Sequence, residues 1–233
     1  MLKQIDRDIW VAEQPLKYLG LPVGTRMSVI RLSSDRLLLI SPIKINEQIK
    51  QELDRLGKVE FIIAPNLFHY LYLEECQQIY PQAKLIAPPG LVTKKPKLAI
   101  DLIFFQDEID FNFELEYILF EGFQVLIPPK IAIVNEIVFF HPESHTLILT
   151  DTAFNFDRSF PFMTQLATRI LGSYQALKPS WLEKLAIKDK KKISNSVEKI
   201  LAWDFQRVIM AHGNIVEDNA KEQLKAGYEW FLS

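Results

Sequence analysis

Apolar residues in the first part of the chain fall into short blocks separated by turn-forming residues. The segments DIWVAE, RMSVIRL and RLLLIS are typical of β-strands, and Pro22, Gly24 and Ser33 to Asp35 lie between them. The next segment, NEQIKQELDRLG, repeats apolar residues at helical spacing, with Asn46 as a suitable N-cap and Gly57 at its end. We therefore expect three strands followed by a helix.

A strand, a helix and a second strand follow in close succession. VEFIIAP is a continuous apolar run, as in a strand that is buried on both faces. LFHYLYLEECQQIY predicts a helix that ends before Pro81, and AKLIAP predicts another buried strand. Strand, helix and strand joined by short links predict a parallel βαβ unit.

The remainder divides into a strand-rich part and a helical part. Between Leu102 and Thr150, successive apolar segments with tight turns predict an antiparallel meander. Helices are predicted over Phe160 to Leu177 and Ser180 to Ala202, a strand at QRVIMAHG and a closing helix at EDNAKEQLKAGYEWFLS. No Pro-, Gly- or Ser-rich linker separates two halves, so we expect one α/β domain over residues 1–233, with mixed sheets and helices on their outer faces.

Composition and charge narrow the class of protein. The 233 residues are 48% apolar and 24% charged, with a formal net charge of −2, which indicates a globular chain without general attraction to nucleic acid or anionic membranes. The single cysteine, Cys76, excludes an internal disulfide and a four-thiolate metal site. The N-terminal segment lacks the apolar region of a secretory signal, and no apolar run reaches about 18 residues. We therefore expect a cytoplasmic protein without a membrane span.

Three apolar strands are followed closely by residues that could bind a metal. His69 comes after FIIAP, Asp151 after TLILT and His212 after RVIMA. In open α/β sheets, ligands collect beyond the strand ends, so these three side chains could converge on one site. Imidazole and carboxylate groups suit zinc, iron or manganese. Structural roles stay open as well: His69 as a core histidine, Asp151 as a turn cap and His212 as a turn residue.

The rest of the sequence offers few further candidates for catalytic or binding residues. His141 precedes the hairpin turn PESH and His145 is its last residue, and both are expected to be exposed. The chain contains no G-x-S-x-G, P-loop or G-x-G-x-x-G motif, which argues against a serine hydrolase of the α/β type and against nucleotide binding by those loops. The phenylalanine-rich stretch from Phe154 to Met163 predicts core, an apolar lid or a dimer surface.

Four segments together resemble a known superfamily. They are APNLFHYLYL (Ala64 to Leu73), YPQAKLIAPPG (Tyr80 to Gly90), EIVFFHPESHTLILTDTAFNF (Glu136 to Phe156) and LAWDFQRVIMAHG (Leu201 to Gly213). They resemble the metallo-β-lactamase superfamily, and more closely its uncharacterised branch called domain of unknown function 4336. The resemblance implies an αββα sandwich with a metal site at one edge, where strands end. It also matches Asp151 to the bridging aspartate and His212 to the last histidine of the superfamily's site.

The same resemblance shows which metal ligands this chain lacks. Active members carry H-x-H-x-D-H after the strand that corresponds to FIIAP, whereas the stretch Pro65 to Leu71 keeps only His69. The superfamily's next histidine has no counterpart in Lys130 to Asn135. Three ligands are too few for two cations but could hold one cation with open positions, as in catalytic zinc sites with three protein ligands.

Two functions follow from these observations. The first is a one-metal hydrolase of small esters, thioesters or phosphoesters, with zinc, iron or manganese on His69, Asp151 and His212. In this hypothesis Asp151 and His212 are the catalytic residues, and Asn66 either adds a carbonyl oxygen to the site or orients a ligand from outside the coordination sphere. The second is a non-catalytic binding module without metal, which would use the phenylalanine-rich stretch as a contact or homodimer surface.

Overall fold

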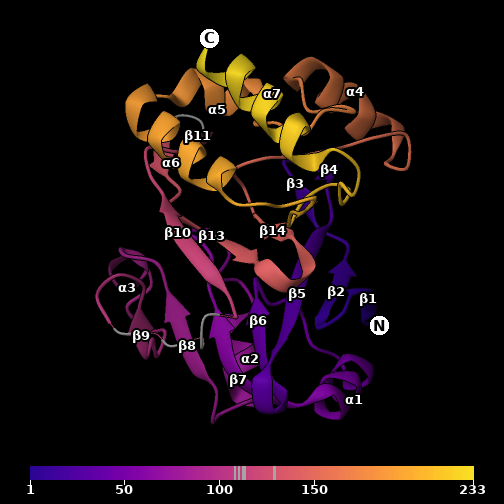
Figure 1. Ribbon diagram of the computed structural model, residues 1–233, viewed down its shortest axis with the longest axis vertical. Helices are drawn as coiled ribbons and strands as arrows, with labels where there is room; N and C mark the ends of the chain where they lie inside the picture. Colours follow the sequence, from indigo (N-terminus) through magenta and orange to yellow (C-terminus); the bar gives the residue numbers. More distant parts are fainter. Residues whose placement is uncertain (108, 110, 112–113, 128–129) are drawn as a thin grey trace. The chain divides into compact units, whose positions relative to one another are not determined.

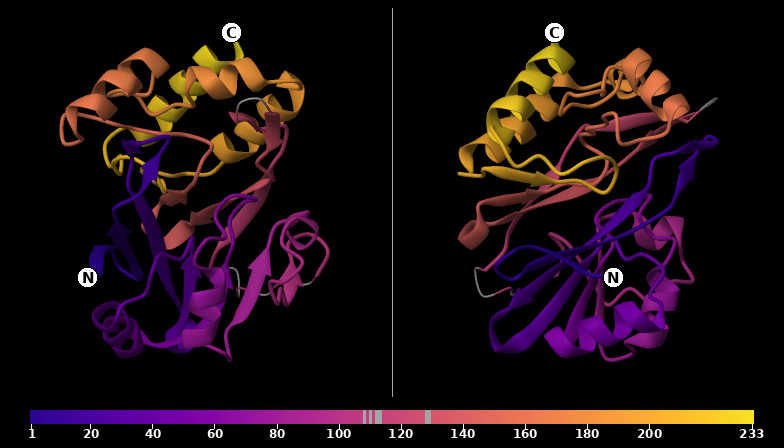
Figure 2. Two further views of the ribbon diagram at one scale, coloured as in Figure 1. Left: turned by 180° about the vertical axis from the view of Figure 1, so that it is seen from behind. Right: turned by 90° about the vertical axis from the view of Figure 1, so that its right-hand side faces the viewer.

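The chain forms two compact units in the computed structural model, which describes residues 1–107, 109, 111, 114–127 and 130–233. Unit 1 comprises Met1–Gln14 and Thr25–Glu114, and unit 2 comprises Pro15–Gly24 and Leu115–Ser233. In each unit a mixed sheet carries helices (Figures 1 and 2). The prediction of a mixed α/β protein is therefore confirmed.

Unit 1 is built on a seven-stranded sheet in the order β1-β2-β5-β6-β7-β8-β9. Neighbouring strands from β1 to β6 pair antiparallel, and those from β6 to β9 pair parallel. The strands are β1 (Lys3–Asp6), β2 (Ile9–Gln14), β5 (Thr25–Leu32), β6 (Arg36–Ile40), β7 (Lys58–Ile63), β8 (Lys84–Ala87) and β9 (Leu102–Ile103). The predicted early strands and the parallel βαβ unit are thus present.

The helices of unit 1 share one apolar core with alternate residues of this sheet. They are α1 (Glu47–Leu56), α2 (Leu73–Ile79) and α3 (Leu91–Lys94), with a short 3₁₀ turn, η1 (Ser33–Asp35). The Asn46 side chain accepts the Ile49 N–H at 2.9 Å, and Gly57 ends α1, as predicted. The core contains side chains from both helices and strands. The helices contribute Ile49 and Leu53 of α1 and Leu73 and Cys76 of α2, and the strands contribute Trp10, Met27, Leu37 and Leu85.

Unit 2 contains a four-stranded sheet in the order β10-β13-β14-β15 and two short hairpins. Strands β10, β13 and β14 pair antiparallel, whereas β14 and β15 pair parallel. The sheet strands are β10 (Glu116–Phe120), β13 (Glu136–His141), β14 (Thr146–Ile148) and β15 (Arg207–Ile209), and η2 (Pro142–Ser144) joins β13 to β14. The hairpins are β3 (Lys17–Tyr18) with β4 (Leu21–Pro22), and β11 (Gln124–Ile127) with β12 (Lys130–Ile133).

The helices of unit 2, α4 to α7, form a layer (Figures 1 and 2). They are α4 (Phe162–Leu171), α5 (Trp181–Ala186), α6 (Lys190–Ala202) and α7 (Ala220–Leu232). The predicted apolar face of the last helix is buried: Tyr228 packs 5.6 Å from Phe120 of β10, measured between ring centroids, and Phe231 packs 5.8 Å from Phe123. These ring contacts fix α7 to the strand-rich part of the unit.

Several predicted boundaries and pairings are wrong. The expected meander is divided, because β9 pairs with β8 in unit 1 while β11 and β12 form a separate hairpin. The helix predicted from Phe160 ends at Leu171, where Gly172 takes a left-handed conformation (φ +90°). The helix predicted over Ser180 to Ala202 is two helices, because the Asp189 side chain caps a new one.

Within the described part of the chain, none of the helices is both long enough and apolar enough to cross a membrane.

Candidate metal-binding residues

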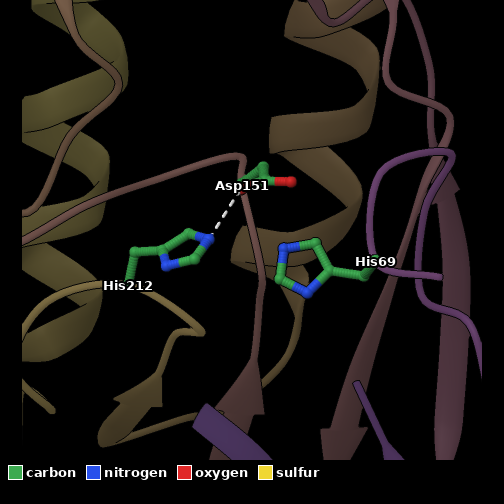
Figure 3. Close-up of side chains that lie close together, drawn as sticks. All are labelled: His69, Asp151 and His212. Carbon is green, nitrogen blue, oxygen red and sulfur yellow. Dashed lines mark ion pairs between the residues drawn. The ribbon is translucent and has the colours of Figure 1, made fainter. Parts of the chain in front are cut away.

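Asp151 and His212 follow two adjacent parallel strands at the same offset. Ile148 of β14 lies opposite Ile209 of β15, and the pairing continues through the Leu149 N–H, which donates to the Ile209 carbonyl at 2.8 Å. Asp151 and His212 each come three residues later. Parallel strands in register end at the same edge, so the two side chains meet there. His212 Nε2 lies 3.5 Å from Asp151 Oδ1 (Figure 3, dashed line).

The chain after His212 packs directly against the chain after Asp151. The Asn214 N–H donates to the Asn155 carbonyl at 2.7 Å. Gly213 has φ +96°, and a Cβ atom at this position would lie 2.3 Å from the same carbonyl oxygen. Glycine is required here because any side chain would collide with backbone. The contact therefore ties the two ligand-bearing loops together.

The turn that carries Asp151 is held by a buried carboxylate, that of Glu136, whose exposure is 0%. Glu136 accepts hydrogen bonds from the N–H and hydroxyl of Thr150 at 2.9 and 2.6 Å, from the Asp151 N–H at 2.6 Å and from the Thr152 hydroxyl at 2.7 Å. The Thr152 carbonyl in turn accepts the Tyr228 hydroxyl of α7 at 2.6 Å. Burial raises the pKa of Glu136 and the charge of Asp151 raises it further, while the threonine hydrogen bonds oppose this.

The tautomer of His212 is set by a backbone carbonyl. His212 Nδ1 lies 2.6 Å from the carbonyl oxygen of Gly24, at the end of the β3–β4 segment. A carbonyl oxygen can only accept, so Nδ1 carries the hydrogen, and in the neutral ring Nε2 carries the lone pair. The nitrogen that faces Asp151 is therefore the one that could bind a metal.

The distance between His212 and Asp151 tests whether these residues fit a cation. A lone pair on Nε2 and a carboxylate oxygen repel each other unless a proton or a cation lies between them. Their separation of 3.5 Å is longer than a good hydrogen bond. Two atoms bound at about 2.0–2.1 Å to one tetrahedral zinc ion lie about 3.4 Å apart. The pair thus has the spacing of two ligands that share one metal ion.

His69, in unit 1, lies in a turn and not in the helix that the sequence predicts. The first helical residue of α2 is Leu73. Asn66 is buried, and its Oδ1 accepts the N–H groups of Phe68 and His69 at 2.7 and 3.0 Å. These side-chain hydrogen bonds replace the ones that a helix would make, so the chain turns instead.

Neighbouring side chains of unit 1 orient this turn. His69 Nδ1 lies 2.6 Å from Ser41 Oγ, directly after β6. On its other side, Lys94 of α3 donates to the Leu67 carbonyl at 2.7 Å and lies 4.0 Å from the centroid of the Phe68 ring. Burial lowers the pKa of Lys94, and the charge of Lys95 adds to this. The His69 turn is thus fixed at both flanks.

Sequence reasoning missed three groups that position the candidate ligands: Ser41, the Gly24 carbonyl and Glu136. A signal existed for two of them. Ser41 follows the apolar strand RLLLI, which is the same strand-end pattern that marks Asp151, and Glu136 is a lone charge that opens the apolar strand EIVFF. The Gly24 carbonyl has no sequence signal, because a backbone acceptor is present at every position.

The two remaining histidines lie at the predicted hairpin turn. His141 is buried, with Nδ1 2.9 Å from Ser144 Oγ, so its expected exposure is wrong. His145 stays partly exposed, and its Nδ1 lies 2.7 Å from the Asp204 carbonyl oxygen. Both histidines therefore make turn and loop contacts.

Solved structures that are similar to this chain include metallo-β-lactamases and a flavodiiron core. A metallo-β-lactamase from Pontibacter korlensis matches with a TM-score of 0.66 and 12% identity over 98% of each chain. One from Erythrobacter litoralis matches with a TM-score of 0.64 and 14% identity, over 98% of this chain and 96% of that one. The Flv1 flavodiiron core from Synechocystis matches with a TM-score of 0.63 and 15% identity, over 100% of this chain and 60% of that one. The chain therefore has the metallo-β-lactamase fold, as its sequence predicts.

Within this fold, the chain belongs to the family described as "Domain of unknown function (DUF4336)", whose model matches residues 6–178. No curated protein matches the sequence.

Proposed function

We propose that this protein is a metal-dependent hydrolase that holds one divalent cation on His69, Asp151 and His212 (Figure 3). Each of the three side chains offers one donor atom of a type that zinc, iron and manganese accept. Two histidines and one carboxylate form a ligand set that leaves positions open for water and substrate.

The observation that carries the proposal is the geometry of His212. Its Nδ1 is engaged by the Gly24 carbonyl, so Nε2 faces Asp151 at the spacing of two ligands on one tetrahedral ion. Second partners of this kind, which fix the tautomer of a metal-binding histidine, are general in metal sites. In the proposal, the hydroxyl of Ser41 holds the orientation of the His69 ring, and Asn66 holds the main chain of that turn.

A cation at this position would polarise a carbonyl or phosphoryl oxygen and make a bound water more acidic. Asp151 would have two roles in the proposal: one carboxylate oxygen would bind the cation, and the other would accept a hydrogen bond from water at the site. His212 holds its ring proton on Nδ1 against Gly24 throughout, so it is a ligand and not a proton carrier. The expected substrates are small esters, thioesters or phosphoesters, whose cleavage needs one activated water and one polarised oxygen.

Metal content tests the proposal directly. The untagged full chain, purified without chelator, is expected to contain about one zinc, iron or manganese ion per chain by elemental analysis. His212→Ala and Asp151→Ala are each expected to lose this metal, and also the hydrolysis of p-nitrophenyl acetate or p-nitrophenyl phosphate. His145→Asn is the matched control, because it removes a histidine outside the proposed ligand set and is expected to retain both.

Each of the following results would contradict part of the proposal. No bound metal after reconstitution with zinc, iron and manganese would refute the proposal and favour the alternative, a binding module without metal. Full metal retention by both His212→Ala and Asp151→Ala would refute the ligand assignment. Metal binding without hydrolysis of any ester or phosphoester would refute the hydrolase and leave a metal-binding protein.

A further inference from the structure

Helix α4 of unit 2 is turned with its apolar side outward. Thr164 and Thr168 are its buried residues, and their hydroxyls donate to the carbonyls of Pro22 and Thr164, both at 2.9 Å. Phe162 is 70% exposed and Ile170 68% exposed. A surface helix normally buries its apolar face and exposes its polar one. The reversed arrangement indicates that something apolar covers α4 in the working protein.

The exposed apolar surface continues from α4 onto α5. A Cβ atom on Gly172, at the end of α4, would lie 3.5 Å from Cδ1 of Trp181, the first residue of α5. Trp181 is exposed, and Leu185, one turn later, is 72% exposed. We define the α4–α5 surface by its six exposed apolar residues: Phe162, Met163, Leu166, Ile170, Trp181 and Leu185.

Basic side chains accompany this surface. Between Arg158 and Lys192 the chain has eight lysine or arginine residues and two acidic ones, although the whole chain carries a net charge of −2. One of the two acids, Glu183, is buried. Lys184 lies 5.3 Å from the Trp181 ring centroid, which places a cation next to an exposed apolar residue of the surface. Lys190 and Lys192 are engaged elsewhere, because Lys190 donates to the Leu232 and Ser233 carbonyls and Lys192 lies 3.6 Å from Glu121. The basic residues left beside the surface are Lys184, exposed Arg158 before α4 and exposed Lys188 after α5.

We propose that the α4–α5 surface docks on the surface of an anionic lipid bilayer. Protruding phenylalanine, leucine and isoleucine side chains insert at the boundary between headgroups and acyl chains, and tryptophan favours the same depth. Lysine and arginine beside them pair with anionic headgroups. The inference is independent of the metal site, because it uses none of the proposed ligands.

Charge argues for a bilayer and against a second copy of the chain. In a two-fold dimer the same patch lies on both sides, so the basic residues of one copy would face those of the other. Such like-charge contacts oppose association. An anionic bilayer accepts both the apolar side chains and the basic side chains beside them. For Phe162 and Met163 we therefore favour contact with a bilayer over the homodimer surface expected from the phenylalanine-rich stretch.

Vesicle co-sedimentation of the full chain tests this inference. We expect binding to vesicles of phosphatidylcholine mixed with phosphatidylglycerol, weaker binding at high salt, and much less binding to phosphatidylcholine alone. Phe162→Ser with Ile170→Ser is expected to weaken binding at least about tenfold, because two inserting side chains are lost. Arg158→Gln with Lys188→Gln is expected to weaken binding to the anionic vesicles only.

The control is Val92→Ser with Phe105→Ser, which removes two exposed apolar side chains of unit 1, whereas the α4–α5 surface belongs to unit 2. It should bind as the unchanged protein does, and circular dichroism should show all variants folded. Equal binding by the Phe162/Ile170 variant, or equal binding to neutral and anionic vesicles, would overturn the inference. So would a dimer in solution that this variant dissociates while no vesicle binds, since a second copy would then be the occupant.

Discussion

The Glu136 carboxylate accepts the backbone N–H of Asp151 at 2.6 Å, so a fully buried acid holds the main chain of a proposed metal ligand. Burying a charge is costly unless hydrogen bonds compensate it. Here the compensation comes from the three consecutive residues 150–152. The turn therefore supplies the hydrogen bonds that compensate the buried charge of Glu136, and the carboxylate holds the turn in its shape.

Glu136→Gln should loosen this turn. Glutamine offers one acceptor oxygen, so the N–H of either Thr150 or Asp151 loses its partner. We expect a loss of about 1–3 kcal/mol in the free energy of unfolding, measured with urea. Zinc affinity, measured by titration of the folded protein, should fall as well. Glu198→Gln, an exposed change on α6, should alter neither quantity, and an unchanged unfolding midpoint for Glu136→Gln would contradict the role of the carboxylate.

Gly213→Ala should separate the loops after Asp151 and His212. The added methyl would lie 2.3 Å from the Asn155 carbonyl oxygen, at a left-handed φ. We expect a loss of at least about 2 kcal/mol in the free energy of unfolding. Gly20→Ala is the matched control, because Gly20 also has positive φ but has no atom within 4 Å of the added Cβ. Equal costs for both variants would mean that the backbone angle, and not the contact with Asn155, requires glycine.

Asn66→Ala should destabilise the His69 turn. The N–H groups of Phe68 and His69 both lose their acceptor, which we expect to cost about 1–3 kcal/mol of unfolding free energy. Asn66→Asp keeps an acceptor oxygen in the same place and should restore the turn in part. Hydrogen exchange at these two amides gives the local readout. Unchanged protection in Asn66→Ala would show that other contacts hold the turn.

Glu183→Gln should change how stability depends on pH. Burial raises the pKa of Glu183 above its usual value, although hydrogen bonds from Ser180 oppose the shift. The folded protein then binds this proton more tightly than the unfolded chain. The contribution of Glu183 to stability therefore falls as the pH rises from about 4.3 through the pKa of the folded state. Glutamine does not titrate and keeps the capping box with Ser180.

Relative to the unchanged protein, the Glu183→Gln variant should thus gain stability between pH 4 and pH 8. Thermal unfolding at both pH values measures the gain, and Glu222→Gln, an exposed change on α7, is the control. Parallel pH profiles for Glu183→Gln and the unchanged protein would refute the assignment.

Cys76 should be inert in the folded protein. Burial raises the pKa of its thiol to about 12, and Glu75 adds to the shift, so little thiolate exists near neutral pH. A thiol reagent such as DTNB should react slowly with the native protein at pH 8 and rapidly in urea. Fast labelling without denaturant would show that α2 opens readily or that the thiol is more acidic.

Local signals in the sequence predict most helices and strands, because caps and apolar spacing act over a few residues. Asn46 and Gly57 define α1 correctly. The same spacing misleads at Phe68 and Tyr70, where the buried Asn66 side chain satisfies the backbone and a turn replaces the helix. Strand partners are harder to predict, since Leu102–Ile103 joins the sheet of unit 1 through pairing with β8, which no local pattern encodes.

The candidate site is predictable in part for the same reason. Asp151 and His212 stand at strand ends, and the parallel register of β14 and β15 places them together as the strand-end argument expects. Their partnership with His69 stays a prediction. Glu136 and the Gly24 carbonyl act through contacts distant in sequence, so only the three-dimensional structure identifies them.

The β3–β4 segment, Pro15–Gly24, contacts parts of unit 2 that lie far from it in the sequence. Its Pro22 carbonyl accepts the Thr164 hydroxyl 142 residues later, and its Gly24 carbonyl meets His212 188 residues later. During synthesis, the contact between Gly24 and His212 can therefore form only after the chain has been made as far as His212. A fragment that starts at Leu115 would contain Asp151 and His212 but not the carbonyl that sets the His212 tautomer. Reassembly of unit 2 from two pieces would need residues 15–24 supplied with the later segment.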